Sequence, residues 1–277
     1  MSFSVNKHTV LCISLAGHPG NFGNYFHNYL YRHFKLNYLY KSCCTDDLKS
    51  AIESIRALQI RGCGVSMPFK SDVLKYMDHL DLAVSEIGAA NTIVNDNGIL
   101  SAYNTDSYSL SSIFSQKKID PNSKVLIKGS GGMARAIVYS IKKHGIKNIT
   151  INARNKNDRT ELVNKWNLDI ITDQHLNEVH FDIIINATPL GMEHLRKECP
   201  FNENIVKKST LVIDVVVNPN GTKLSRICDL YNIPLIRGEA ITKLQAKKQF
   251  ELYTGQLTEN ELVDEAYRNY ELLASSN

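Results

Sequence analysis

The segment from Lys124 to Gly145, KVLIKGSGGMARAIVYSIKKHG, constrains the fold more than any other part of the chain. A short aliphatic run leads directly into a glycine turn, and a helical pattern follows the turn. The turn has the spacing Gly129-x-Gly131-x-x-Ala134, in which the first glycine allows a tight turn and the second lets backbone N–H groups approach a pyrophosphate. This pattern predicts a dinucleotide-binding βαβ unit with phosphates at the helix N-terminus. A glycine turn without a ligand is the alternative.

The residues after the next expected strand indicate which dinucleotide binds. A site for NAD would place an Asp or Glu about 20 residues beyond the turn, where it accepts from the ribose 2′-hydroxyl. This chain has Asn152-Ala153-Arg154 there instead. Because a planar guanidinium suits a 2′-phosphate, we predict NADP as the cofactor. Lys156 and Arg159 follow closely, and they either add to the phosphate site or form an ordinary solvated basic loop.

Alternating strand and helix patterns continue on both sides of this unit. A series of six strands with helical patterns between most of them predicts a doubly wound sheet; the strands are expected at 124–128, 148–152, 169–172, 182–187, 210–216 and 234–237. Upstream, a βαβ series predicts a mainly parallel sheet; its strands are expected at 10–15, 38–40 and 62–67, and its helices at 26–34 and 48–58. Residues 91–94 and 100–103 read as a hairpin around the Asn95–Gly98 turn.

The length of 277 residues suits two domains. The polar segment 116–123, with Pro121, reads as a linker after a helical stretch. From Glu239 to Ser275 the pattern is helical, with a break at Gly255 and a capping-box signature, Thr258-x-x-Glu261, for a final helix that we expect to pack on the first domain. We therefore predict an α/β protein of two domains, with residues 1–105 and 238–277 forming one domain and 106–237 the other.

Charge and cysteine content exclude several classes of function. Lys and Arg number 32 against 28 Asp and Glu, and the excess of 32 − 28 = +4 is too small and dispersed to indicate nucleic acid or a membrane surface as a partner. No apolar run reaches the ~18 residues that would span a bilayer. The six cysteines form no Cys-x-x-Cys pair and have no His at zinc-finger spacing. We expect a reduced, cytoplasmic protein without a metal site that acts on a small molecule.

The first domain carries polar residues that core packing does not explain. Ser66-x-Pro68-x-Lys70 lies at the carboxyl end of the expected strand at 62–67, so its side chains emerge where ligands bind in open α/β sheets. Asn91 opens the hairpin, and Asn104-Thr105-Asp106 closes it. Reduction of a ketone by hydride leaves an oxyanion that needs a proton, and a lysine beside a carboxylate can supply one. Lys70 and Asp106 are the candidate pair, with an ordinary surface ion pair as the alternative.

Six motifs in this order resemble the shikimate dehydrogenases over nearly the whole chain. They are VSMPFK (65–70), GAANT (88–92), NTD (104–106), GSGG (129–132), NATPLGM (186–192) and the segment 238–255 with Gln245, Ala246 and Phe250. The resemblance implies a substrate domain completed by C-terminal helices and a Rossmann domain that binds NADP. It also implies reversible reduction of 3-dehydroshikimate with NADPH, a step of the chorismate pathway to aromatic amino acids.

The resemblance also implies roles for individual residues. Lys70 matches the family's proton donor or acceptor, and Asp106 matches the residue that orients it and holds a substrate hydroxyl. Ser66, Asn91 and Gln245 match positions that bind ring hydroxyls, although Gln245 would also suit a helix at a domain junction. The cofactor positions are Gly129, Ser130, Gly131, Gly132, Met133, Asn152, Arg154, Thr188, Met192 and Gly238. For the last three, a cap at a strand end, a core methionine and a turn glycine are the alternatives.

The chain departs from the family where the substrate carboxylate is bound. The family has a Ser-x-Ser-Pro pair between a Gly-x-Pro turn and a His-Asn pair, whereas residues 20–26, GNFGNYF, are two residues shorter and lack serine. Asn21, Asn24, Tyr25 or backbone N–H groups of the two glycines would have to replace this clamp. Val217 stands where the family has tyrosine, and Ala153 where the cofactor loop often has asparagine.

These departures resemble a divergent, shikimate dehydrogenase-like branch and leave several functions open. The substrate is shikimate or another hydroxylated cyclohexene or cyclohexane carboxylate such as quinate, with slow turnover of shikimate as one outcome. A catalytically idle, NADP-binding regulatory protein is the second hypothesis. The third is a related dehydrogenase for folate or amino-acid substrates, against which Asn91, Asp106 and Gln245 argue. The chain is expected to be a monomer or a homodimer.

Overall fold

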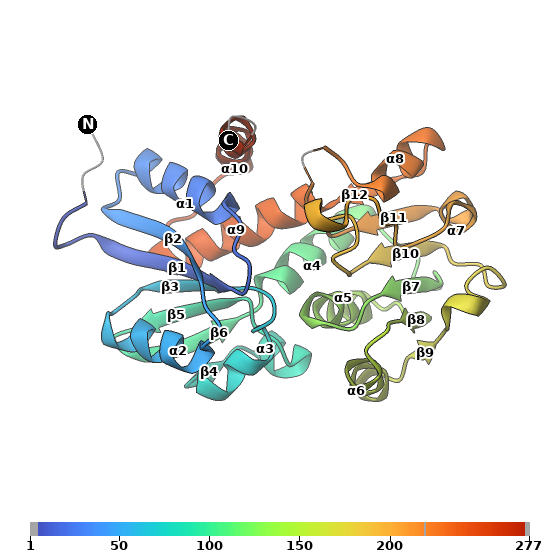
Figure 1. Ribbon diagram of the computed structural model, residues 1–277, viewed down its shortest axis with the longest axis horizontal. Coiled ribbons are helices and arrows are strands. Elements are labelled where there is room, and N and C mark those ends of the chain that lie inside the picture. Colours follow the sequence, from blue (N-terminus) through green and yellow to red (C-terminus); the bar gives the residue numbers. More distant parts are fainter. Residues whose placement is uncertain (1–4, 219, 275–277) are drawn as a thin grey trace. The chain divides into compact units, whose positions relative to one another are not determined.

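The structure is a computed structural model that describes residues 5–218 and 220–274. It consists of two compact units. The described parts of residues 1–105 and 243–277 form the first unit, and those of residues 106–242 form the second. Within the described residues each unit holds one six-stranded sheet covered by helices (Figure 1). The two-domain α/β fold class is confirmed.

The sheet of the first unit combines the predicted parallel strands and the predicted hairpin. Its order is β2-β1-β3-β5-β6-β4, with β1 parallel to both β2 and β3, and β5 antiparallel to both β3 and β6. Asn97 and Gly98 have positive φ in the turn between β5 and β6, as the Asn-Gly step predicts. The strands are β1 (Val10–Ala16), β2 (Tyr38–Cys44), β3 (Gly62–Val65), β4 (His79–Leu80), β5 (Thr92–Asp96) and β6 (Ile99–Tyr103).

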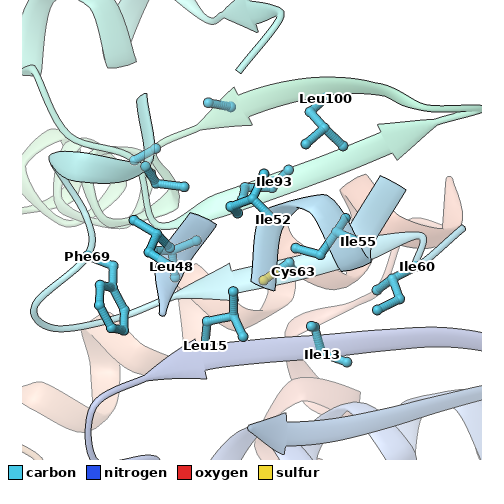
Figure 2. Packing of buried hydrophobic residues seen from close by; sticks show 14 of the residues in the cluster. Ile13, Leu15, Leu48, Ile52, Ile55, Ile60, Cys63, Phe69, Ile93 and Leu100 are labelled. Atoms are coloured by element: carbon cyan, nitrogen blue, oxygen red, sulfur yellow. The ribbon is translucent and has the colours of Figure 1, made fainter. Parts of the chain in front are cut away.

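Alternating side chains of these strands support helices on both faces of the first sheet. Ile13 and Leu15 of β1 pack with Ile52 and Ile55 of α2 (Leu48–Ala57) on one face (Figure 2). Cys12 points to the opposite face, into a cluster formed by helices far apart in the sequence. These helices are α1 (Phe22–His33), α9 (Gly238–Thr254) and α10 (Asn260–Ala274). The C-terminal helices therefore pack on the first unit, as predicted.

The smaller elements of the first unit are the 3₁₀ helix η1 (Asp72–Tyr76) and α3 (Leu82–Ile87). No sequence pattern predicted these two elements or β4, because each is too short to show a clear period.

Several predicted element ends are wrong by a few residues. α1 begins at Phe22 instead of Phe26, and β3 ends at Val65 instead of Met67, since Pro68 has no N–H group to continue the ladder. The predicted capping box is also wrong. α10 begins at Asn260, and the buried Thr258 hydroxyl has no hydrogen-bond partner among the described residues. Ser275, the last residue of the predicted helical tail, lies outside the described residues.

The second unit is the predicted doubly wound sheet. Its order is β12-β11-β10-β7-β8-β9, and every neighbouring pair is parallel. The chain runs from β7 outward to β9 and then crosses to β10, so β7 and β10 are neighbours at the topological switch point, where such sheets bind ligands. The strands are β7 (Val125–Lys128), β8 (Ile149–Asn152), β9 (Asp169–Ile170), β10 (Ile183–Asn186), β11 (Leu211–Asp214) and β12 (Leu235–Arg237).

Helices cover both faces of this second sheet. Leu126, Ile184 and Val212 pack toward α7 (Glu203–Lys208) and α8 (Lys223–Leu230). The alternate strand residues face the other way, and α5 (Gly132–Lys143) and α6 (Lys156–Trp166) lie on that side (Figure 1).

The remaining elements of the second unit are one helix and two short turns. α4 (Thr105–Lys117) extends two residues into the segment predicted as a linker, and η2 (Asp173–His175) and η3 (Glu193–Leu195) are short 3₁₀ turns. None of the described helices combines the length and apolar character that crossing a membrane requires.

Candidate substrate and cofactor sites

A cavity of about 200 Å³ opens in the first unit, near the carboxyl ends of β1, β2 and β3. Ser66, Lys70, Asn91 and Gln245 line it together, although Gln245 is more than 150 residues from Asn91 in the chain. The remaining lining residues are Ser14, Ala16, His18, Pro19, Gly20, Phe22, Gly23, His27, Tyr40, Ser42, Gly64, Val65 and Gln249. The tertiary structure thus brings three predicted substrate-binding residues and the predicted catalytic Lys70 to one small-molecule cavity.

Asn91 is held rigidly at the edge of this cavity. Its side-chain oxygen accepts from the Thr105 backbone N–H at 2.8 Å and from the Thr92 hydroxyl at 2.9 Å. Its Nδ2 donates to the Thr105 hydroxyl at 3.0 Å and to Gln245 Oε1 at 3.4 Å. Asn91 is only 3% exposed, so these bonds determine the direction in which its amide faces a ligand.

A second glutamine, which the sequence reasoning missed, supports Asn91 from α9. Gln249 Nε2 donates to the Asn91 carbonyl at 3.2 Å and to the Thr92 hydroxyl at 3.0 Å. Gln249 also hydrogen-bonds the side chain of His27, which is 1% exposed. Burial lowers the pKa of His27 to about 3, so this imidazole is neutral at pH 7.

Lys70 and Asp106 belong to two separate chain segments, which are hydrogen-bonded to Ala90 and to Asn91, respectively. The Lys70 carbonyl accepts from the Ala90 N–H at 2.8 Å, which places Lys70 beside the residue preceding Asn91, and its side chain lines the cavity. Asp106 directly follows Thr105 in the first turn of α4 and is fully buried. Their action as a catalytic pair stays a prediction.

Asn21 and Tyr25, the expected replacements for the carboxylate clamp, are not among the residues lining the cavity. The Asn21 side chain accepts from Asn24 Nδ2 at 3.2 Å at the start of α1, and the Tyr25 ring lies 6.2 Å from that of Tyr270. Gly20, which precedes α1, and Gly23 in its first turn do line the cavity. Binding of the substrate by Asn21 and Tyr25 stays a prediction, and the lining of the cavity does not favour it.

The lining also includes polar residues that the sequence reasoning did not select, among them Ser14 of β1 and Ser42 of β2. The available signal was a serine at an inward-facing position of an otherwise apolar strand. That signal alone does not say whether the position faces a cavity or a packed helix.

The glycine turn of the second unit has the backbone form that its motif requires. Gly129 has a φ of +125°, and a Cβ there would lie 2.7 Å from the Ala187 carbonyl oxygen. A Cβ at Gly131 would meet no atom within 4 Å. α5 begins at Gly132 without a side-chain cap, so its first N–H groups are available to an anion. These features fit the pyrophosphate of a dinucleotide, with Ser130 and Met133 beside the glycines.

Two exposed basic residues, Arg154 and Lys156, follow the end of β8. Arg154 is exposed immediately beyond the strand, whereas Arg159 donates to the Ala153 carbonyl at 3.1 Å. Asn155 caps α6 by accepting from two backbone N–H groups. Asn152 is buried, and its Nδ2 donates to the Ile171 carbonyl at 3.1 Å, so this amide joins β8 to the chain after β9. Arg154 is therefore the arginine of this loop that is accessible to a 2′-phosphate.

A buried carboxylate organises the loop that carries Thr188 and Met192. Asp214 accepts from Asn186 Nδ2 at 2.9 Å and from the Thr222 hydroxyl at 2.6 Å, while Asn186 Oδ1 accepts from the Thr188 hydroxyl at 2.6 Å. Burial raises the pKa of Asp214, and these hydrogen bonds oppose that rise. Met192 is half-buried at the end of this loop.

Gly238 starts α9 in a position that only glycine fits, because a Cβ would lie 2.6 Å from the Val216 carbonyl oxygen. The backbone of this glycine therefore lies against the segment that follows β11.

Comparison with known proteins gives consistent matches along the chain. Residues 23–93 match the family model described as shikimate dehydrogenase substrate binding domain, and residues 111–233 match the model for shikimate / quinate 5-dehydrogenase. A shikimate dehydrogenase-like protein of Haemophilus influenzae is 40% identical, covering 95% of this chain and 97% of its own. A shikimate dehydrogenase (NADP(+)) of Clostridium beijerinckii is 32% identical, covering 88% and 92%.

A solved structure of a shikimate 5-dehydrogenase-like protein superposes with a TM-score of 0.86. It is 39% identical, and the match covers 96% of this chain and 99% of that one. The fold and the order of the elements are therefore those of a known two-domain architecture.

Proposed function

The chain belongs to the shikimate dehydrogenase family, and on that premise we propose that it transfers hydride reversibly between NADP(H) and a hydroxylated ring acid, shikimate or a close relative. It is an oxidoreductase of that family. The observation that carries the proposal is the meeting of Ser66, Lys70, Asn91 and Gln245 in one cavity. With shikimate as substrate, the reaction is the dehydrogenase step of the chorismate pathway.

In this proposal, one domain binds the substrate and the other binds NADP. Residues 1–105 and 238–277 form the substrate domain, and residues 106–237 form the NADP-binding domain. The turn around Gly129 and Gly131 holds the pyrophosphate, and the exposed Arg154 pairs with the 2′-phosphate. Thr188, Met192 and Gly238 border the nicotinamide. When bound, NADP(H) donates or accepts the hydride at the substrate carbon.

Lys70 handles the proton that accompanies this hydride. In the reducing direction the substrate ketone becomes an oxyanion, and the Lys70 ammonium donates a proton to that oxygen. In the oxidising direction the neutral amine takes the hydroxyl proton. Asp106 orients Lys70 and holds a neighbouring hydroxyl, as the resemblance implies, while the Asn91 and Gln245 amides bind ring hydroxyls. Because Thr92 and Thr105 fix the Asn91 amide, a ring hydroxyl accepts from Asn91 Nδ2 in place of the 3.4 Å contact with Gln245 Oε1, and only ligands that present a hydroxyl in that direction can do so.

A second candidate substrate is a different ring acid, such as quinate. The segment 20–26 has no serine, and neither Asn21 nor Tyr25 lines the cavity, so the carboxylate is bound differently from the family pattern. An altered anchor shifts the preference among closely related acids.

The test is a panel of hydroxylated ring acids with NADP and with NAD, monitored by the absorbance of the reduced cofactor. We expect saturable turnover of at least one acid with NADP, and a loss of about 10²- to 10⁴-fold in kcat for Lys70→Ala. Lys75→Ala is the matched control, because Lys75 is exposed after the same strand and lies outside the cavity. Absence of turnover above the Lys70→Ala background on the whole panel would refute the proposal.

A further inference from the structure

A row of polar positions crosses the sheet beneath the substrate cavity. Ser14 of β1 is in register with Ser42 of β2 and with Gly64 of β3, and Gly64 is in register with Thr92 of β5. Residues in one such row point to the same face, which here is the face toward α1 and α9. Ser14, Ser42 and Gly64 all line the cavity.

Side chains from three elements, β1, β2 and α9, converge over Gly64. A Cβ at this position would lie 3.0 Å from the Tyr40 hydroxyl, 3.4 Å from Ser14 Cβ and 3.6 Å from Gln249 Nε2. The absence of a side chain at Gly64 therefore lets the Tyr40 hydroxyl lie close to the backbone of β3. Tyr40 itself is 4% exposed and stacks on His27 with ring centroids 4.3 Å apart, so the position of its hydroxyl is well defined.

The hydroxyl groups of Ser14, Tyr40 and Ser42 line the side of the cavity formed by the sheet, which we call its floor. These hydrogen-bond donors suit an anion. Tyr40 is hydrogen-bonded to Ser14, and a pair of hydroxyls that share one bond keeps one O–H free to donate to a ligand. Ser42 adds a second O–H. Burial raises the pKa of Tyr40, so its hydroxyl remains a donor at neutral pH. No Asp or Glu is among the described residues that line the cavity, so nothing there repels a carboxylate.

We propose that Ser14, Tyr40 and Ser42, which we call the strand hydroxyls, bind the carboxylate of the ring acid in place of serines in the segment 20–26. The inference rests on the proposed function and names the group that anchors its substrate. Ser14 and Ser42 stand on adjacent strands about 4.8 Å apart, so the one free O–H of the Ser14–Tyr40 pair and the O–H of Ser42 can each reach one carboxylate oxygen.

The span of the cavity supports this placement. Ser42 lies on β2, and Asn91 immediately precedes β5, which is three strands away in the order β2-β1-β3-β5. Three gaps correspond to about 14 Å. A six-membered ring acid with a hydrogen bond at each end fits that length, so the carboxylate lies over β1 and β2 while the ring hydroxyls reach Asn91 and Lys70.

The experiment compares an acid with its uncharged ester. The binding of shikimate and of methyl shikimate is measured by calorimetry on the full chain, together with KM and kcat for whichever acid the panel identifies. The variants are Ser14→Ala with Ser42→Ala, and Tyr40→Phe, which preserves the ring stacked on His27. Ser101→Ala is the control, since Ser101 is a half-buried strand serine outside the cavity. Thermal unfolding and NADPH binding verify that each variant is folded.

We expect the double serine variant to weaken binding of the acid by about ten- to a hundredfold, raising KM far more than it changes kcat. Binding of the ester should change by less than about threefold, and Ser101→Ala should change neither. Equal losses for acid and ester, or unchanged binding of the acid in folded variants, would overturn the role of the strand hydroxyls while leaving the proposed function standing. If the wild-type chain turns over no ring acid, both proposals fall.

Discussion

Acidification should destabilise this protein through His27. The imidazole is 1% exposed, and its Nδ1 has no hydrogen-bond partner among the described residues. Burial lowers the pKa of His27 to about 3, whereas a histidine in an unfolded chain titrates near 6.5. Between these two values the unfolded state binds a proton that the folded state does not. The contribution to stability is therefore complete above pH 6.5 and declines as the pH falls toward 3.

The size of this effect follows from the slope of one proton. The free energy of unfolding should fall by about 1.4 kcal/mol for each pH unit below 6.5, and by about 2–3 kcal/mol at pH 4.5, from His27 alone. Carboxylates add their own acid sensitivity, so the comparison needs a variant that removes only the imidazole. His27→Gln does this and keeps an amide that can hydrogen-bond Gln249.

Urea unfolding at several pH values between 7 and 4.5, followed by circular dichroism, measures the difference. His27→Gln is expected to be less stable than wild type at pH 7, and this gap should narrow by about 1.4 kcal/mol per pH unit below 6.5. His8→Gln, at an exposed histidine of the same unit, should run parallel to wild type. A constant gap between wild type and His27→Gln would show that His27 is not held neutral by burial.

Three further changes test other parts of the structure. Asn91→Ala leaves the Thr105 N–H and the Thr92 hydroxyl without their acceptor, so urea unfolding should show a loss of about 2–4 kcal/mol, which unchanged stability would contradict. Gly238→Ala places a Cβ 2.6 Å from the Val216 carbonyl and should cost about 1–3 kcal/mol; an unaltered Tm would refute the close approach. Arg154→Ala should weaken NADPH binding about tenfold or more and leave NADH binding unchanged in fluorescence titrations, whereas equal losses would exclude a 2′-phosphate contact.

Much of the fold was predictable because its signals are local. The strand, glycine turn and helix around Gly129 form one continuous segment, and the Asn-Gly step of the hairpin specifies its own turn. Element ends were less predictable. The start of α1 and the end of β3 were each misplaced by a few residues, since helix and strand ends depend on capping and on the partners available nearby. The prediction of a capping box at Thr258 is wrong for the same reason, since α10 begins at Asn260.

The candidate site was predictable where a residue follows a strand directly. Ser66 comes immediately after β3, Lys70 follows four residues later, and Asn91 comes immediately before β5, so their place at the sheet edge follows from the strand pattern. Asn21 and Tyr25 were chosen from a segment whose glycines, rather than these side chains, line the cavity. Which side of a loop or helix turns inward depends on packing that a single sequence does not display.

The sequence by itself determined the two α/β units, the dinucleotide turn and the residues at the ends of β3 and β5, because backbone hydrogen bonding and side-chain periodicity act over neighbouring residues. Only the tertiary structure decided that Ser14, Ser42 and Gly64 form one row and that Gln249 reaches across it from α9. Strand register and helix placement arise from contacts between residues that are distant in the chain. The floor of the cavity is made of such contacts, and therefore its chemistry emerges only when the chain is folded.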